Sequence, residues 1–233
     1  MAENSPTNLK LSVIIPVFNE KNTIEQILQR VSNVPIEKEI IIVDDCSTDG
    51  SREIIKSITN RNVKPVFQEK NQGKGAAIRT GIEHATGDML IIQDADLEYD
   101  PKDYVKLLQP IITGEADVVY GSRFLGAAKS MSGLHYFGNK LLTLATNILF
   151  GTALTDMETC YKMMKTPIIK NIKLRANRFD FEPEITAKLL KKGVKIKELP
   201  INYEGRSWTE GKKITWRDGV AALASLIKFR FID

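Results

Sequence analysis

Three carboxylates within residues 94–98 carry the strongest chemical signal in this sequence. Asp94, Asp96 and Glu98 stand at alternate positions after the apolar run 89–92, which predicts a buried strand. Close anionic groups at a strand end repel one another and raise one another's pKa, and a divalent cation removes that cost. Mg²⁺ and Mn²⁺ prefer hard oxygen ligands and usually bind one or two carboxylates together with substrate phosphates. The pattern therefore favours a metal-diphosphate site, with a solvated acidic turn as the alternative.

A second acidic segment, VDDCSTDG at residues 43–50, lies between an apolar run and an expected helix. The carboxylate of Asp45 is suited to accept hydrogen bonds from a nucleoside, either from base N–H groups or from ribose hydroxyls. Ser47 or Asp49 could instead cap the following helix, which is a common use of these residue types. Both interpretations can hold together, with Asp49 as the cap and Asp45 as the ligand.

Two further segments could bind phosphate. Residues 71–75 (NQGKG) resemble a phosphate-binding turn, but they match neither a Walker A sequence nor the G-x-G-x-x-G fingerprint, and glycines equally suit a tight strand-to-helix turn. Arg123 follows an expected strand, and its guanidinium suits bidentate phosphate binding, with an ordinary surface charge as the alternative. The only histidines, His84 and His135, lie near neither a carboxylate pair nor a serine in a catalytic spacing. A Ser-His-Asp hydrolase is therefore poorly supported.

Short apolar strands alternate with helical patterns along most of the chain. Strands are predicted at residues 10–17, 39–44, 63–67, 89–93, 116–120 and 194–199, with a short one at Met163. Helices are predicted at 22–31, 51–58, 73–85, 101–112, 138–150, 183–190 and 215–231, with Gly193 as a C-cap. This alternation indicates an α/β fold with a mostly parallel central sheet flanked by helices. Because ligands bind at the carboxyl ends of such strands, segments 18–20, 44–49 and 94–98 should meet in one crevice.

Composition and charge exclude several classes of protein. A chain of 233 residues with 42% hydrophobic content is long enough for one well-buried domain, and a net charge of +4 is too small to indicate nucleic-acid binding. Cys46 and Cys160 show neither metal nor disulfide spacing, which favours a reducing compartment. The polar N-terminus has no apolar signal region, and the longest apolar stretch, 141–150, is about half of the roughly 20 residues that a membrane span needs. We therefore expect a soluble or peripheral protein.

Four motifs occur in an order that resembles the family 2 glycosyltransferases with the GT-A fold. They are PVFNE at 16–20, VDDCSTD at 43–49, NQGKG at 71–75 and DAD at 94–96. Segments 94–101, 121–123, 156–162 (DMETCYK) and the basic stretch 205–213 are similar to the polyprenyl-phosphate branch of that family, typified by dolichyl-phosphate mannose synthase. The resemblance covers about residues 10 to 230 and implies a Rossmann-like GT-A domain.

The resemblance also implies roles for individual residues. Those that would bind the nucleotide sugar are Pro16, Phe18, Glu20, Val43, Asp45, Lys74, Asp94 and Ala95. Asp96 and Glu98 would bind the metal, Mg²⁺ or Mn²⁺, although this branch often has Gln at the position of Glu98. Those that would bind the acceptor phosphate are Arg123, Arg206 and Lys212. Those that would act in catalysis are Asp94, Asp156 and Arg123, with Asp156 either orienting the acceptor or serving only as a structural acid.

The activity implied by the resemblance is inverting, metal-dependent transfer of a hexose from a UDP- or GDP-sugar to a polyprenyl phosphate, either dolichyl or undecaprenyl. A phosphate monoester is already anionic near neutral pH, so this acceptor needs no strong general base. The alternative is a glycosyltransferase that acts on a sugar hydroxyl in cell-surface polysaccharide synthesis, which would need an obvious base. A nucleotidyltransferase usually carries a glycine-rich N-terminal loop, which residues 16–20 lack, and the intact acidic motif argues against a binding module without activity.

We expect a single domain, residues 1–233, with a nucleotide-sugar-binding half at 10–125, an acceptor half at 126–210 and an interfacial amphipathic helix at 211–233. Apolar residues at 216, 220, 223, 226, 227 and 231 form one stripe of the last helix, flanked by Arg217, Lys228 and Arg230. A buried core helix would show the same stripe, so both possibilities stay open. An interfacial helix would bring the site to a lipid acceptor. The expected location is cytoplasmic and peripheral, at the inner face of the membrane.

Overall fold

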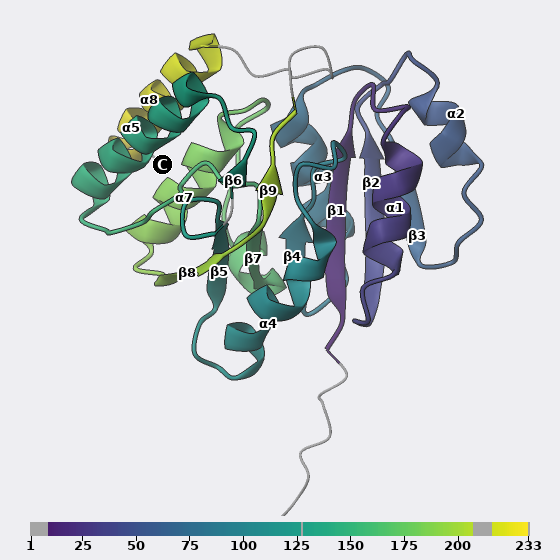
Figure 1. Cartoon of the computed structure of the whole chain (residues 1–233), viewed down its shortest axis with the longest axis horizontal. Helices are drawn as coiled ribbons and strands as arrows, with labels where there is room; N and C mark the ends of the chain where they lie inside the picture. The colour runs from purple at the N-terminus through teal and green to yellow at the C-terminus, as the bar shows by residue number, and fades with distance from the viewer. Residues whose placement is uncertain (1–8, 127, 207–215, 233) are drawn as a thin grey trace, which may run out of the picture.

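A mixed seven-stranded sheet forms the centre of the computed structural model, which describes residues 9–126, 128–206 and 216–232 (Figure 1). The strand order is β3-β2-β1-β4-β7-β5-β8. The strands are β1 (Leu11–Val17), β2 (Lys38–Asp44), β3 (Val63–Phe67), β4 (Met89–Ile92), β5 (Val118–Ser122), β7 (Lys162–Lys165) and β8 (Ile196–Pro200). Strand β7 runs antiparallel to both of its neighbours, and the other adjacent pairs are parallel. The predicted α/β fold with a mostly parallel sheet is confirmed.

Helices cover both faces of this sheet, with α1 and α4 in front of it and α3 behind it in Figure 1. The helices are α1 (Ile24–Ser32), α2 (Ser51–Lys56), α3 (Lys74–His84), α4 (Tyr104–Ile112), α5 (Gly133–Phe150), α6 (Thr166–Lys170), α7 (Phe181–Lys191) and α8 (Trp216–Phe231). A Cβ atom at Gly81 of α3 would lie 2.4 Å from Cγ2 of Ile14. Glycine therefore allows α3 to pack directly on β1.

The element boundaries differ from the prediction in a few places, each for a local reason. Helix α5 begins at Gly133 rather than at 138, because the Ser132 side chain accepts the N–H of His135 and caps it. Strand β5 begins at Val118, since the N–H of Ala116 is donated to the turn that ends α4. Helix α6 and the pair β6 (Ala128–Lys129) with β9 (Tyr203–Glu204) were not predicted, because such short elements leave no periodic pattern.

Strand β7 joins the two parallel parts of the sheet, β3-β2-β1-β4 and β5-β8. It lies between β4 and β5, although it follows both of them in the chain. Because β7 is antiparallel, the segment that precedes it, residues 156–161, lies at the edge where β4 and β5 have their carboxyl ends. This single reversed strand brings a loop from the second half of the sequence to the predicted crevice.

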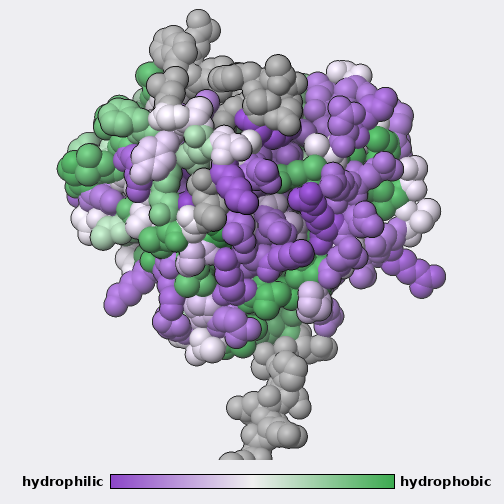
Figure 2. Space-filling view, viewed as in Figure 1, coloured by the Kyte–Doolittle hydropathy of each residue, from purple (hydrophilic) through white to green (hydrophobic). Residues whose placement is uncertain are grey.

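Exposed large apolar side chains gather on α5 and α8. Those on α5 are Tyr136, Phe137, Leu141, Leu144 and Ile148, and those on α8 are Val220, Leu223, Ile227 and Phe231. Figure 2 shows apolar surface at the left of the view, where Figure 1 places these helices. The opposite side of α8 is buried through Ala222, Leu226 and Phe229, and α8 lies against α5 and α7. Leu226, which the sequence placed in one stripe with exposed residues, therefore belongs to the core.

At the opposite end of the sheet, Glu39 of β2 is almost fully buried among donors of five residues, which lie at β1, on β3 and in the loop before β4. Its oxygens accept the Ser12 hydroxyl at 2.7 Å, the Thr86 N–H at 2.6 Å and the Lys64 ammonium at 2.6 Å, with Lys10 and the Gly87 N–H each at 3.1 Å. Burial alone would raise the pKa of this carboxyl, but the donors outweigh it, and the pKa lies well below its ordinary value.

We predict that Glu39→Gln lowers the free energy of unfolding by about 2 kcal/mol at neutral pH, because a charged acceptor of several buried donors is lost. The folded-state pKa is depressed, so the wild-type stabilisation is present above the ordinary value of 4.5 and is lost as pH falls below it. The difference between the two proteins should therefore shrink toward pH 3 in urea unfolding. Glu115→Gln, at an exposed ion pair, is the control. Equal stability of Glu39→Gln and wild type at pH 7 would contradict this account.

Candidate active site

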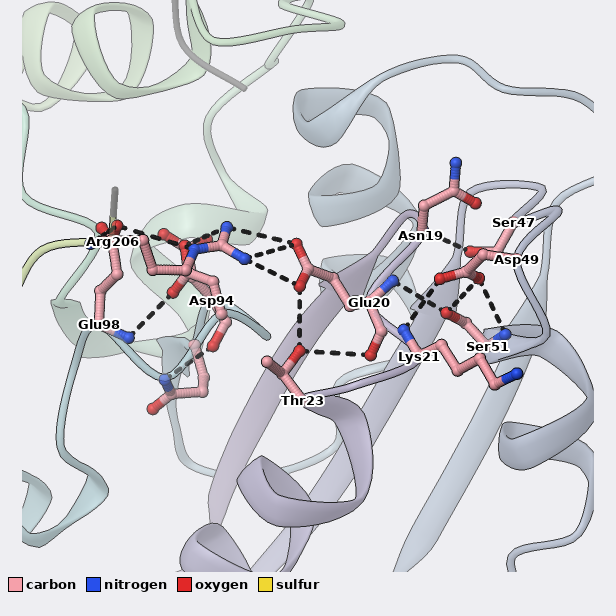
Figure 3. A network of polar contacts seen from close by, with 12 residues as sticks. Asn19, Glu20, Lys21, Thr23, Ser47, Asp49, Ser51, Asp94, Glu98 and Arg206 are labelled. Carbon is pink, nitrogen blue, oxygen red and sulfur yellow. Dashed lines mark hydrogen bonds and ion pairs between the residues drawn. The ribbon is translucent and has the colours of Figure 1, made fainter. Parts of the chain in front are cut away.

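The loops that follow β1, β2 and β4 meet at one edge of the sheet, as the sequence predicted. Each contains a non-glycine residue with positive φ: Asn19 at 54°, Cys46 at 61° and Leu97 at 66°. Such backbone is uncommon and persists only when contacts fix it. Between the first two loops, the N–H of Asn19 donates to the Ser47 hydroxyl (Figure 3). The Asn19 side-chain oxygen accepts the N–H of Thr48. These contacts therefore fix the conformation of the loops that line the crevice.

The guanidinium of Arg206 lies between the β1 and β4 loops (Figure 3). Its Nη1 lies 3.1 Å from Oε2 of Glu20, its Nη2 lies 3.2 Å from Oδ2 of Asp96, and its Nε lies 3.8 Å from Oε1 of Glu98. The backbone N–H of Arg206 also donates to Oε1 of Glu98 at 2.8 Å. Sequence reasoning assigned Arg206 to the acceptor phosphate, and the structure adds that it contacts both residues predicted to bind the metal.

A cluster of three tyrosines, Tyr99, Tyr161 and Tyr203, fixes the position of the segment that carries Arg206. The residue comes directly after Gly205 at the end of β9, where the Tyr203 hydroxyl donates to Oε2 of Glu98 at 2.7 Å. The Tyr99 ring packs against the Tyr161 ring at 4.7 Å and the Tyr203 ring at 5.2 Å between centroids. Sequence reasoning did not predict this cluster, because its three tyrosines are far apart in the chain and no local pattern indicates that they pack together.

Asp94 and Asp96 lie in different electrostatic environments. Burial alone would raise the pKa of Asp94, but the adjacent Lys74 lowers it. Burial and the neighbouring carboxylates of Asp94 and Glu98 raise the pKa of Asp96 to about 8. Asp94 is therefore held ionised by a lysine, whereas Asp96 gains most from an additional positive charge.

The donor set fits a divalent cation held jointly with a substrate. Within the described residues, no group of three or more His, Cys, Asp or Glu side chains is arranged to hold a metal ion alone. Asp96 and Glu98 nevertheless direct oxygens toward one cationic group, the Arg206 guanidinium, and Asp94 is engaged with Lys74. Two carboxylates are the usual protein share of a Mg²⁺ or Mn²⁺ site completed by phosphate oxygens.

Lys74 links the acidic segment to a residue that sequence reasoning missed. Its Nζ lies 2.8 Å from Oδ1 of Asp94 and 3.0 Å from Oε1 of Glu182, which is buried in the first turn of α7. Burial alone would lower the pKa of Lys74, but these two carboxylates hold it well above its usual value. In the sequence, Glu182 reads as an ordinary acid near a helix start, so nothing marked it.

The glycine turn at 71–75 is shaped by close packing. A Cβ at Gly73 would lie 2.4 Å from the carbonyl oxygen of Asn177, and one at Gly75 would lie 2.6 Å from that of Ala176. The backbone N–H groups of Gln72 and Gly73 both donate to the Asp45 carboxylate at 2.7 Å. The tight-turn interpretation is therefore right for these glycines. Asp45 holds the turn in place, and its contact with a nucleoside stays a prediction.

Arg123 and Asp156 form a buried ion pair. Nε and Nη2 of Arg123 each lie 2.8 Å from one oxygen of Asp156, and the N–H of Arg123 donates to the same carboxylate at 3.0 Å. The alternative of an ordinary surface charge at Arg123 is wrong, because only 6% of the residue is exposed, and its contact with phosphate stays a prediction. Its guanidinium also lies 5.3 Å from the ring centroid of Tyr203. Both oxygens of Asp156 are occupied by this arginine.

Glu158 is a further acid that the motif analysis did not single out. Its Oε1 is buried and has no hydrogen-bond partner among the described residues. Burial, followed by the nearby charge of Glu182, raises the pKa of Glu158 to about 8. The segment before β7 therefore supplies one acid that is fully paired, Asp156, and one that is not.

The other predicted residues have simpler positions. Pro16 and Phe18 lie partly buried at the end of β1, whereas Val43 and Ala95 are almost fully buried. The N-cap of α2 is Gly50, with no side-chain cap hydrogen bond, so the prediction of Asp49 as the cap is wrong; its carboxylate accepts the N–H of Ser51, the first residue of α2, at 2.9 Å. Lys212 lies outside the described residues.

Comparisons with known proteins identify the fold and the family. The family model described as Glycosyl transferase family 2 matches residues 12–172. A crystal structure of glucosyl-3-phosphoglycerate synthase from Mycobacterium tuberculosis, in complex with Mn²⁺, UDP and glucosyl-3-phosphoglycerate, has a TM-score of 0.74 at 19% identity. The similarity covers 97% of this chain and 81% of that one. The fold of this chain is therefore of the GT-A type.

Curated relatives agree with this assignment. A low-salt glycan biosynthesis hexosyltransferase, Agl6, from Haloferax volcanii is 31% identical over 89% of this chain and 51% of its own length. Dolichol-phosphate mannosyltransferase from Pyrococcus furiosus is 28% identical over 88% and 61%, and dodecaprenyl-phosphate galacturonate synthase from Rhizobium johnstonii is 29% identical over 87% and 62%. The chain thus spans between about half and three-fifths of these relatives. With the acidic loops of the site at the carboxyl ends of its strands, this chain belongs to glycosyl transferase family 2.

Proposed function

We propose that this protein transfers a hexose from a nucleoside diphosphate sugar to polyprenyl phosphate, with inversion and with the help of a divalent cation. The observation that carries the proposal is the meeting of Asp94, Asp96 and Glu98 with Lys74 and Arg206 at one edge of the sheet. Such an edge offers charged groups of both signs to a sugar diphosphate. The family and the names of two relatives, which include dolichol phosphate and dodecaprenyl phosphate, support the choice of acceptor.

The donor would lie across the loops after β1, β2 and β4. The residues that would contact it are Pro16, Phe18, Glu20, Val43, Asp45, Lys74, Asp94 and Ala95. Asp96 and Glu98 would hold Mg²⁺ or Mn²⁺, and the bound ion would supply electrostatic stabilisation to the diphosphate as it leaves. Lys74 keeps Asp94 ionised next to the sugar. Arg123, Arg206 and Lys212 would bind the acceptor phosphate.

The state of Asp156 favours a phosphate acceptor. Because both of its oxygens accept from Arg123, this acid is poorly placed to remove a proton. An acceptor phosphate, whose second pKa is about 6, needs no such base near neutral pH. Its oxygen would attack the anomeric carbon in line while the diphosphate departs on the opposite side.

A second candidate, transfer to a sugar hydroxyl, is favoured by one observation, the unpaired buried oxygen of Glu158. A carboxyl whose pKa is raised to about 8 is suited to accept a proton from a hydroxyl. The two candidates differ in what Glu158→Gln does. It should reduce transfer to a hydroxyl by about 10²-fold or more and leave transfer to polyprenyl phosphate within a few-fold of wild type.

We also propose that the protein is peripheral to the cytoplasmic face of the membrane and contacts it through α5 and α8. The exposed apolar side chains of these helices are accompanied by Lys140, Lys228 and Arg230, and residues 133–150 and 219–232 contain no Asp or Glu. Within the described residues, none of the helices has the length and apolar character to cross a bilayer. Asp218 is the one acidic residue in the sequence of α5 and α8, and apolar side chains flanked mainly by basic ones suit an anionic lipid surface.

The activity is tested by mass spectrometry of the lipid product after incubation with polyprenyl phosphate and a panel of UDP- and GDP-sugars. We expect a lipid-linked hexose that disappears with EDTA and returns with Mn²⁺ or Mg²⁺. Asp96→Asn should keep the fold and lose about 10²-fold or more of the rate, because electrostatic stabilisation of the leaving group is lost. Asp117→Asn, at an exposed ion pair, is the matched control. Full activity in EDTA would rule out the metal.

Membrane contact is tested by sedimentation with vesicles. The protein should bind anionic vesicles at low salt and leave them at high salt, since each basic residue near such a surface contributes about 1 kcal/mol that salt screens. Changing Lys228 and Arg230 together to Gln should weaken binding, whereas changing the exposed Lys70 and Lys102 to Gln should not. Equal binding to neutral and anionic vesicles would refute the electrostatic part, and no binding to either would refute the surface.

A further inference from the structure

We propose that Arg206 and the divalent cation compete for the same carboxylate oxygens, so that metal binding moves the guanidinium from Asp96 and Glu98 toward Glu20. This inference rests on the metal site of the proposed function and deepens it. It makes Arg206 a positioning residue whose location depends on the metal.

The competition follows from how the oxygens are used. One oxygen of Asp96 accepts the N–H of Glu98 at 3.2 Å, and the other faces Nη2 of Arg206 at 3.2 Å. One oxygen of Glu98 accepts the Tyr203 hydroxyl, and the other faces Nε and the N–H of Arg206. The oxygens that are not held by the Glu98 N–H or by Tyr203 are therefore those that Arg206 contacts: Oδ2 of Asp96 through Nη2, and Oε1 of Glu98 through Nε at 3.8 Å and the backbone N–H at 2.8 Å. A divalent ion that binds them has to displace a like-charged group at contact distance.

The structure also supplies the place to which the guanidinium can move. Both Nη atoms of Arg206 already contact Glu20, at 3.1 to 3.5 Å, on the side of the guanidinium away from Glu98 (Figure 3). The Thr23 hydroxyl, 2.9 Å from Oε2 of Glu20, holds that carboxylate. The Gly205 and Glu204 N–H groups are fixed to the carbonyls of Lys129 and Glu98, so the backbone can stay while the side chain turns.

A guanidinium released in this way has consequences for the order of binding. Once Nη2 no longer contacts Asp96, the guanidinium, still beside Glu20, can turn that donor toward a phosphate, which guanidinium groups bind through charge-assisted hydrogen bonds. Metal binding and phosphate binding are then linked, and each strengthens the other by the same factor. The acceptor phosphate would bind productively only after the cation is in place.

The test measures Mn²⁺ affinity by titration calorimetry, with no nucleotide and no turnover. Arg206→Gln should bind Mn²⁺ about tenfold more tightly than wild type, within the range typical of coupled sites. Arg206→Lys should fall between them, and it replaces Arg206→Gln if that variant does not fold. Arg30→Gln, at an exposed position on α1, should leave the affinity unchanged. Unchanged or weaker binding by Arg206→Gln would overturn the proposal.

A second variant, Glu20→Gln, tests whether the displaced guanidinium moves to Glu20. If Glu20 receives the displaced guanidinium, this change should weaken Mn²⁺ binding in wild type and have no effect in the Arg206→Gln background. Equal weakening in both backgrounds would mean that Glu20 binds the metal itself, and would overturn the proposed movement. Asp96→Asn should abolish binding in every background. If neither wild type nor Arg206→Gln binds Mn²⁺, the metal site of the proposed function fails together with this inference; if both bind it equally, only this inference fails.

Discussion

The site depends on one electrostatic constraint: several carboxylates share a largely buried edge of the sheet, and each needs a cation. Glu20 follows β1, whereas Asp94, Asp96 and Glu98 follow β4, and these loops are drawn together by the parallel pairing of their strands. Close like charges in a poorly solvated place are unfavourable unless positive groups lie among them. Lys74 and Arg206 meet that need, so their positions, and those of the segments that carry them, are coupled to the acids.

The cations come from distant parts of the chain, which explains several features of the fold. Lys74 begins α3, and the glycines on either side of it allow the segment at 176–177 to pack against the turn. Arg206 follows the short strand β9, whose Tyr203 packs on Tyr99. Small elements with little hydrophobic area of their own are therefore important, because they fix the charges of the crevice.

The reversed strand β7 connects the site to the apolar face on α5. The loop before β7 carries Asp156, which holds Arg123, and the N–H of Met157 donates to the Thr143 hydroxyl of α5 at 3.1 Å. Next to Arg123, the Phe124 ring packs edge-on against Tyr136 of α5 at 5.1 Å between centroids. The apolar face that we propose as the membrane contact therefore begins beside the proposed acceptor site, so a lipid phosphate and its chain could be bound side by side.

The sequence by itself determined the alternation of strands and helices, the parallel character of the sheet and the acidic segment at its edge. These features depend on local spacing, because hydrophobic periodicity and residues at strand ends are visible within a few positions. It also marked Asp94, Asp96 and Glu98 as one group. The tertiary structure decided which cation faces which acid. The contacts of Arg206 with Glu20, of Lys74 with Glu182 and of Arg123 with Asp156 join residues separated by 33 or more positions, and no local pattern records such pairs. It also decided that Leu226 is core while its neighbours in the same stripe are exposed, because a helix that packs on two others buries only the side that they cover.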